Sequence, residues 1–253
     1  MARVFDISPL KINGQTVPMA VRVDARAKRL ILRMDNHGKL TVTCPGDRYV
    51  DAAIQMARSR TGWIADRLAE LPEPAHLRPG VAVPVLGKER MITFSPSIQT
   101  GVVTPDSVSV PAAVDNVGDV VVSTLAKELK RYCRNCADHW QDSLGVQYSR
   151  VRVRDMKTRW GSCTARGDLT FNTRLVFAPP QVLDYVILHE MCHLRFLDHS
   201  PEFWSLVENH CQDYLVQEAW LKSEGRSLFR YGAVGDVSLP PKRTSVTELP
   251  PPG

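Results

Sequence analysis

Apolar and polar residues alternate along much of the N-terminal part of the chain, as they do in half-buried strands. The alternation runs through VPMAVRVDA, RLILRM and KLTVTCP, and it predicts strands between residues 17 and 43. From Val50 to Leu71 the apolar residues instead recur at helical spacing, until prolines follow. More strands are predicted at residues 81–94 and 101–112, the first with a turn at Gly87.

Helical spacing dominates the rest of the chain. One helix is predicted from Val120 to Leu144 and ends at Gly145, a natural C-terminal stop. Strands are predicted again between residues 149 and 177.

Two prolines, Pro179 and Pro180, then open a strongly periodic helix that we expect to continue to about Leu197. Ser200 followed by a proline is an N-cap signature that starts a helix reaching about residue 210, and a last helix is predicted at residues 213–223.

These elements predict an α+β fold. A β-rich N-terminal part is expected at residues 15–112, and a helical part with a small sheet is expected at residues 119–226. The stretch at residues 233–253 contains five prolines and few apolar residues, so we expect it to be a disordered tail.

Composition adds modest limits. The formal net charge of +5 favours an anionic partner only slightly, because such values are common in ordinary globular proteins. The N-terminus has no apolar signal segment, and no stretch approaches 18 consecutive apolar residues. We therefore expect a cytoplasmic protein without a membrane partner, whose six cysteines are reduced thiols. Cys133 and Cys136 form a CxxC, but within a predicted helix we interpret them as packing residues.

A metal-site motif lies in the helix after Pro180. Residues 189–193 read HEMCH, and residues four apart on a helix share one face about 5–6 Å apart at Cβ. Two imidazoles there can converge on one zinc ion. Glu190 lies about 100° round the helix from His189, where its carboxylate can take a proton from a zinc-bound water.

A third histidine follows closely. His199 precedes the helix that starts at Ser200, and a turn between the two helices can swing its ring back toward His189 and His193. Three protein ligands with an open fourth position are the arrangement of catalytic zinc, whereas structural sites are closed by four ligands. Histidines that merely pack on an amphipathic helix are the alternative interpretation.

The sequence around this motif resembles the YgjP-like metallopeptidase family, which is related to SprT-type and WLM-type proteases of the minimal gluzincin kind. The resemblance is carried by RWGSC (159–163), LTFNTRL (169–175), APPxVLDYVxxHExxH (178–193) and HSxxFW (199–204), and it extends over about residues 17–222. It implies a zincin-like, zinc-binding part with His189, His193 and His199 as ligands and Glu190 as the catalytic residue.

The spacing between His193 and His199 also equals that of the metzincins. Those proteins have a glycine where this chain has Phe196, and that glycine permits a sharp turn after the helix. Without it, we expect the helix to continue past His193, which argues against a metzincin.

Basic residues are dense just before the motif. Arg150, Arg152 and Arg154 alternate along a predicted strand, and Lys157, Arg159 and Arg166 follow. The usual meaning is a solvated face, and the alternative is an anion-attracting rim beside the zinc. Within the family motifs, we predict that Arg159 and Arg174 contact substrate or stabilise transition-state charge.

The favoured function is zinc-dependent hydrolysis of a peptide or protein, with zinc as the cofactor and Glu190 as general base. The substrate backbone is expected to pair with an edge strand near residues 169–175. A second hypothesis keeps the site but cleaves a phosphoanhydride of a nucleotide held by the basic rim. A third is a nucleic-acid-binding module with structural zinc, which the lack of paired cysteine knuckles disfavours.

Overall fold

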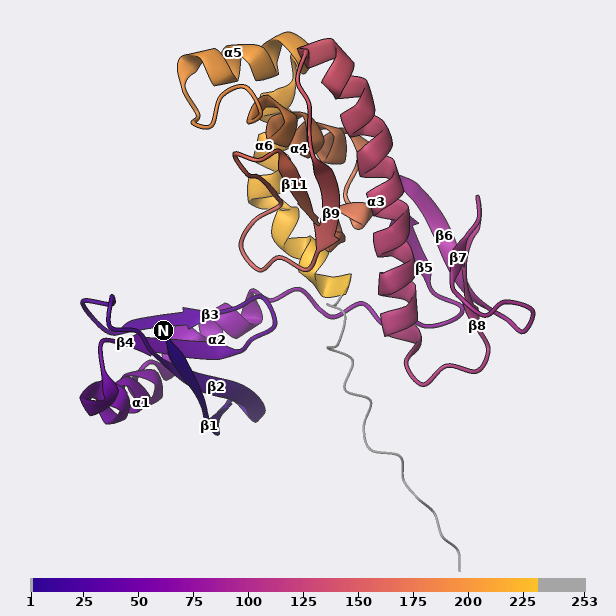
Figure 1. The fold of residues 1–253 in the computed structure, drawn as a ribbon. Coiled ribbons are helices and arrows are strands. Elements are labelled where there is room, and N and C mark those ends of the chain that lie inside the picture. Colours follow the sequence, from indigo (N-terminus) through magenta and orange to yellow (C-terminus); the bar gives the residue numbers. More distant parts are fainter. Residues whose placement is uncertain (1, 232–253) are drawn as a thin grey trace, which may run out of the picture.

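The computed structural model describes residues 2–231, and Figure 1 shows an α+β arrangement with a β-rich N-terminus, as predicted. Its strands form three small sheets, with strand orders β1-β2-β4-β3, β5-β6-β8-β7 and β10-β11-β9. The predicted tail at residues 233–253 lies outside the described residues. Among those described, none of the helices is both long and apolar enough to cross a bilayer.

The first sheet consists of β1 to β4, and β2 and β4 pair in parallel while the outer pairs are antiparallel. Its strands span Arg3–Ile12, Gln15–Val23, Ile31–Met34 and Leu40–Cys44. The alternation buries one face of β4, whereas β2 has three consecutive buried residues and β3 is at most half-buried. Strand β1 was not predicted, because all but the last of its residues are exposed or half-buried and it carries no alternating pattern.

Two helices cover this sheet where one was predicted. They are α1 (Val50–Ser59) and α2 (Thr61–Ala69), and the break falls at Arg60, whose φ of −105° and ψ of 32° are not helical. The buried side chains of sheet and helices form one hydrophobic cluster, which includes Val21, Leu40 and Ile64. We call residues 3–69 the N-terminal lobe.

The second sheet lies against the long helix α3 (Val117–Leu144), as Figure 1 shows. Its strands are β5 (Ala82–Val85), β6 (Lys88–Ser95), β7 (Val102–Val103) and β8 (Ser107–Pro111). The predicted turn between β5 and β6 is confirmed, because Leu86 and Gly87 both adopt positive φ there. Gly145 ends α3 in the left-handed conformation, also as predicted.

The third sheet carries residues of the RWGSC and LTFNTRL motifs and lies on the other side of α3 (Figure 1). Strands β9 (Arg150–Arg154) and β11 (Asp168–Asn172) pair in parallel, and β10 (Gly161–Cys163) pairs antiparallel with β11. Strand β11 is therefore the centre of the sheet, and residues 173–177 beyond it form the 3-10 helix η2. The expectation of an edge strand near residues 169–175 is wrong, because β11 is paired on both sides. Strand β10, which precedes β11 in the chain, is an edge strand of this sheet instead.

The remaining helices are α4 (Pro180–Cys192), α5 (Pro201–His210), α6 (Tyr214–Ser223) and the 3-10 helix η3 (Gly225–Tyr231). Of these, α4 packs against this sheet, and α5 and α6 pack against α4. Ser200 caps α5, since its side chain accepts a hydrogen bond from Phe203 N at 3.4 Å.

The second and third sheets share one large hydrophobic cluster with α3 to α6, and we call residues 77–231 the main lobe. Among the described residues, this cluster has no member in common with the cluster of the N-terminal lobe. The β-rich part predicted at residues 15–112 thus contributes to both clusters. We propose that the chain divides near residues 70–76 rather than between residues 112 and 119.

Candidate functional site

Helix α4 brings the first two histidines together. Its first turn begins at Pro180, and nearly every residue behind that is buried, so the helix runs through the core of the main lobe. His189 and His193 lie one turn apart on one face, with ring centroids 5.0 Å apart and ring planes nearly perpendicular. Packing of α4 therefore fixes where both imidazoles lie.

His199 completes the cluster because α4 ends early. The helix stops at Cys192 with His193 as its C-cap, so the expected continuation to about Leu197 is wrong. The turn that follows needs no glycine at position 196, because Phe196 does not have a positive φ. Among the described residues other than glycine, those with positive φ are Asn13 and Leu86. The chain then returns so that the Nε2 atoms of His199 and His189 lie 3.1 Å apart.

The three imidazoles fit a metal ion that prefers nitrogen ligands. One ring nitrogen from each of the three residues lies within 4.8 Å of the other two. Nitrogens bound about 2.0–2.1 Å from a tetrahedral zinc ion are about 3.3–3.4 Å apart, close to the observed Nε2 separation of 3.1 Å. Three neutral imidazoles with room for a further ligand are a donor set suited to catalytic zinc.

Hydrogen bonding sets the tautomer of His193. Its Nδ1 atom lies 2.9 Å from the carbonyl oxygen of Phe196. A carbonyl oxygen only accepts, so Nδ1 carries the proton and Nε2 presents its lone pair to the cluster. His189 differs, because its Nδ1 is buried without a hydrogen-bond partner among the described residues, and packing alone holds its ring.

Helix α5 supplies that packing. The ring of Phe203, which is fully buried, lies 4.9, 4.6 and 4.9 Å from the rings of His189, His193 and His199. Trp204 stacks on His199 at 5.6 Å, and this aromatic layer continues to Tyr214. Both Phe203 and Trp204 belong to the HSxxFW motif, but sequence reasoning gave them no role in the site.

Burial favours the neutral form of the His189 and His193 imidazoles in the metal-free protein. It lowers the pKa of His189 to about 3, and the neighbouring His193 and His199 rings add to the effect. It also lowers the pKa of His193, against the opposing effect of the hydrogen bond to Phe196. Neutral imidazoles are the form that binds a metal ion.

Glu190 is buried next to the first histidine of the cluster. It is 6% exposed, and the backbone of Gly161 lies so close that a Cβ atom there would overlap its carboxyl group. Burial raises the pKa of Glu190 to about 8, while the positive charge of Arg159 and a hydrogen bond from the Cys163 backbone oppose that rise. A buried carboxyl group with such a pKa is suited to moving protons, and a divalent cation beside it would lower the pKa further.

The two predicted substrate residues lie in different surroundings. Arg159 is exposed and close enough to Glu190 to act on its charge, so it stays a candidate for substrate contact. Arg174 is 1% exposed and donates to the carboxylate of Asp155, and it offers no surface to a substrate. Its motif position did not reveal this, because an arginine that pairs in the interior looks the same in sequence as one that binds a ligand.

The basic strand does not form a rim at the metal centre. Val153, Phe171 and Gly161 are cross-strand neighbours, and Gly161 shows that this face of the sheet lies against Glu190. Side chains alternate along a strand, so Arg150, Arg152 and Arg154 extend from the opposite face. Arg150 forms an ion pair with Asp168 at 2.8 Å on that outer face.

The thiols take no part in the site. All six cysteines are free, and Cys192 is fully buried within α4. Burial raises the pKa of the Cys136 and Cys163 thiols to about 11, and it raises the pKa of Cys133 as well. Thiols that hold their protons in this way are poor nucleophiles and poor ligands.

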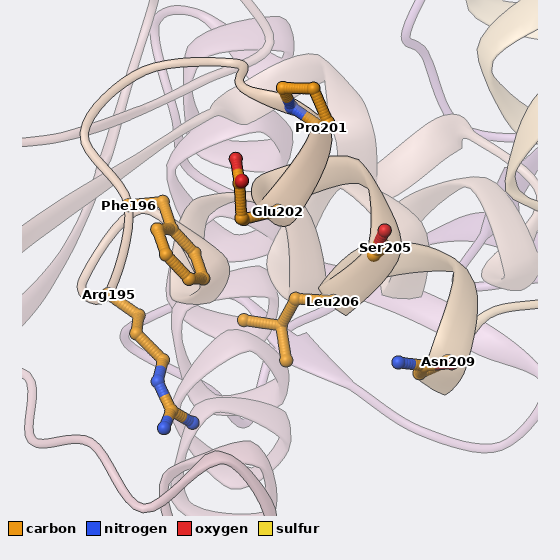
Figure 2. Close-up of a pocket in the computed structure, with 7 residues that line it drawn as sticks. All are labelled: Arg195, Phe196, Pro201, Glu202, Ser205, Leu206 and Asn209. Atoms are coloured by element: carbon orange, nitrogen blue, oxygen red, sulfur yellow. The ribbon is translucent and has the colours of Figure 1, made fainter.

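Figure 2 shows a pocket on the far side of α5. Arg195 and Phe196 line it from the preceding turn, and Glu202, Ser205 and Asn209 line it from the helix. Phe203 and Val207 lie about 100° or more round the helix from those three residues and are buried in the core instead. The pocket is thus separated from the histidine cluster by the body of α5.

The chain is similar to a known family of metallopeptidase domains. The profile of a family described as YgjP-like, metallopeptidase domain, matches residues 28–224. Among curated proteins, none matches the chain. The crystal structure of the metallopeptidase zymogen of Pyrococcus abyssi abylysin aligns with 36% of this chain and 94% of its own at 23% identity and a TM-score of 0.32. The crystal structure of the metallopeptidase zymogen of Methanocaldococcus jannaschii jannalysin aligns with 34% of this chain and 93% of its own, at 21% identity and a TM-score of 0.31.

Proposed function

This chain belongs to the YgjP-like metallopeptidase family, and we propose that it is a zinc-dependent peptidase in which His189, His193 and His199 hold the metal and Glu190 is the general base. The observation that carries the proposal is the convergence of three imidazoles next to a buried carboxyl group. Cation binding alone would not need a carboxyl group that is buried, unpaired with a base and adjacent to the ligands.

Zinc held by these residues would supply Lewis-acid chemistry, which acidifies water and polarises a carbonyl oxygen. The role of the protein residues follows from their positions. Glu190 accepts the proton of the attacking water on a carboxylate oxygen and passes it to the leaving amine. Gly161 and Cys163 hold that carboxylate in place, and Arg159 contributes positive charge near it.

The edge strand β10 supports a peptide as substrate. It leads directly past Glu190, and it is paired on one side only within its sheet. An extended peptide adding to that edge would place its backbone carbonyl groups beside the metal cluster. This replaces the strand near residues 169–175 that we expected to serve as the docking edge.

The outward direction of the arginines weakens the alternative of a nucleotide substrate. A phosphoanhydride needs positive charge around the reacting group, but Arg150, Arg152 and Arg154 lie on the face of the sheet away from Glu190. Structural zinc in a nucleic-acid-binding module is disfavoured too, since a closed four-ligand site is typical there and a buried Glu190 would serve no purpose.

Two variants test the proposal. His189→Ala should lose most of the zinc, measured by atomic emission, whereas Glu190→Gln should keep zinc and fold but lose about 10²-fold or more in peptide cleavage. Peptide libraries and nucleotides should both be screened with wild-type protein. Zinc retained at full occupancy in a His189→Ala, His193→Ala double variant would contradict the metal site, and pyrophosphate release without any peptide cleavage would contradict the substrate.

A further inference from the structure

We call residues 155–160, which join β9 to β10, the strap. The strap lies between the N-terminal lobe and the buried carboxyl group of Glu190. It carries Arg159 and leads directly into Gly161. Asn172 holds its backbone, because Asn172 Nδ2 donates to the carbonyl oxygens of Met156 at 2.7 Å and Arg159 at 3.0 Å. The backbone N–H of Asn172 also donates to the carbonyl oxygen of Trp160 at 2.8 Å.

Arg174 holds the beginning of the strap. Its guanidinium donates to the carboxylate of Asp155, and its backbone amide donates to Asn172 Oδ1 at 3.2 Å. Arg174 therefore contacts both the strap and the residue that fastens the strap. Burying a guanidinium to this degree is costly unless polar partners compensate it. Asp155 compensates the charge of Arg174, while the Nε atom of Arg174 has no hydrogen-bond partner among the described residues.

The other side of the same guanidinium faces the N-terminal lobe. Arg174 Nη2 lies 3.3 Å from His37 Nε2, and the guanidinium carbon lies 4.4 Å above the ring of Phe229. The turn that carries His37 also reaches the strap itself, since Lys157 Nζ lies 3.8 Å from the carboxylate of Asp35. Trp160 packs beside Phe229 with ring centroids 5.7 Å apart.

We propose that Arg174 is a positioning residue that ties the strap to the turn at residues 35–38 and so keeps Gly161 and Cys163 against Glu190. The N-terminal lobe thereby takes part in shaping the active site without touching the metal ligands. The inference rests on the proposed function, in which Glu190 moves the proton. A planar guanidinium can bind a carboxylate and stack on an aromatic ring at once, whereas a lysine ammonium can only replace the charge.

Arg174→Lys and Asp155→Asn test the inference by hydrogen exchange of the full-length zinc protein. Both should speed exchange of the amides at residues 155–163 about tenfold or more, while exchange in α4 stays unchanged. Zinc content should also stay unchanged, because the ligands lie outside the strap. We expect kcat for peptide cleavage to fall about tenfold with a smaller change in KM, because proton transfer depends on where the Glu190 carboxylate lies.

Arg150→Gln is the matched control. It removes another arginine–aspartate pair of the same sheet, at the far end from the strap. The inference is overturned if residues 155–163 exchange at the wild-type rate in both test variants, or if Arg150→Gln speeds them equally. Asp155 is partly exposed, so its variant should fold even if Arg174→Lys does not. Hydrogen exchange is measured without substrate, so its outcome can be read separately from peptidase activity. Full peptidase activity in Glu190→Gln would therefore overturn the proposed function alone.

Discussion

The backbone of Gly161 lies directly against the carboxyl group of Glu190, so the absence of a side chain at residue 161 is what lets the edge strand β10 pass the proposed general base. Gly161 has no positive φ that would itself require glycine. The requirement is therefore one of space, and it ties the strand geometry to the position of a single carboxylate.

Gly161→Ala should displace that carboxylate. We expect a loss of about 1–3 kcal/mol in the free energy of unfolding and a loss of peptidase activity of about 10²-fold, with zinc retained. Urea unfolding, metal analysis and peptide cleavage are the measurements. Gly46→Ala is the control, because a Cβ atom at Gly46 meets nothing within 4 Å. Unchanged activity in Gly161→Ala would mean that the carboxylate tolerates a shift and that its tight placement is unimportant.

Phe203 should matter for the metal although it has no ligand atom. Its ring contacts all three imidazoles, and Phe203→Ala would leave a cavity beneath them that costs about 3–5 kcal/mol of unfolding free energy. Zinc affinity should fall as well, because the rings lose the packing that holds them together. Phe203→Leu, which refills most of the cavity, should recover most of both quantities. An unaltered zinc dissociation constant in Phe203→Ala would contradict a role for this packing.

The metal-free protein should lose stability as pH falls. The pKa of His189 is lowered to about 3 in the folded state against 6.5 in the unfolded chain, so the unfolded state binds the proton first. The stabilisation is complete above pH 6.5 and is lost progressively toward pH 3. Between pH 7.5 and pH 5 this loss amounts to at most about 2 kcal/mol. Denaturant titrations of metal-free wild type and His189→Gln measure it, and equal pH slopes for the two proteins would refute it.

The outer face of the third sheet should be dispensable for cleaving neutral peptides. Replacing Arg150, Arg152 and Arg154 together with Gln should change kcat/KM by less than about threefold, because exposed charges on the opposite face are screened beyond about 8–10 Å. Stability should change little, since the one ion pair lost is exposed. A rise in KM of tenfold or more at moderate salt would show that substrate does reach this face.

The secondary structure was largely predictable because its elements bury one regular face. Helix α3, the turn at Gly87 and the start of α5 at Ser200 each carry a local signal that tertiary packing did not override. Strand β1 has no such signal, since its residues are mostly exposed and backbone pairing with β2 places it. The end of α4 was misjudged because a turn after His193 is possible without a residue of positive φ.

The convergence of the three histidines was predictable from the sequence, but the surroundings of the candidate site were not. The spacing of HEMCH places His189 and His193 on one helix face whatever the fold. The roles of Gly161, Phe203 and Arg174 depend on contacts between segments distant in the sequence, and no local pattern encodes those contacts. A glycine next to a predicted strand in the RWGSC motif was the one available signal of a close approach, because glycine within a strand often marks a point where another group comes near.

The separation of the two hydrophobic clusters bears on how the molecule melts. Cooperative units follow contiguous packing, whereas the contacts between the lobes include those of His37 with Arg174 and Phe229 and the ion pairs Lys157–Asp35 and Arg226–Glu70. Calorimetry should therefore resolve two overlapping transitions rather than one. If zinc binds at the proposed ligands, it stabilises only the unit that carries them, so added zinc should move the transition of the main lobe upward and leave that of the N-terminal lobe nearly where it was.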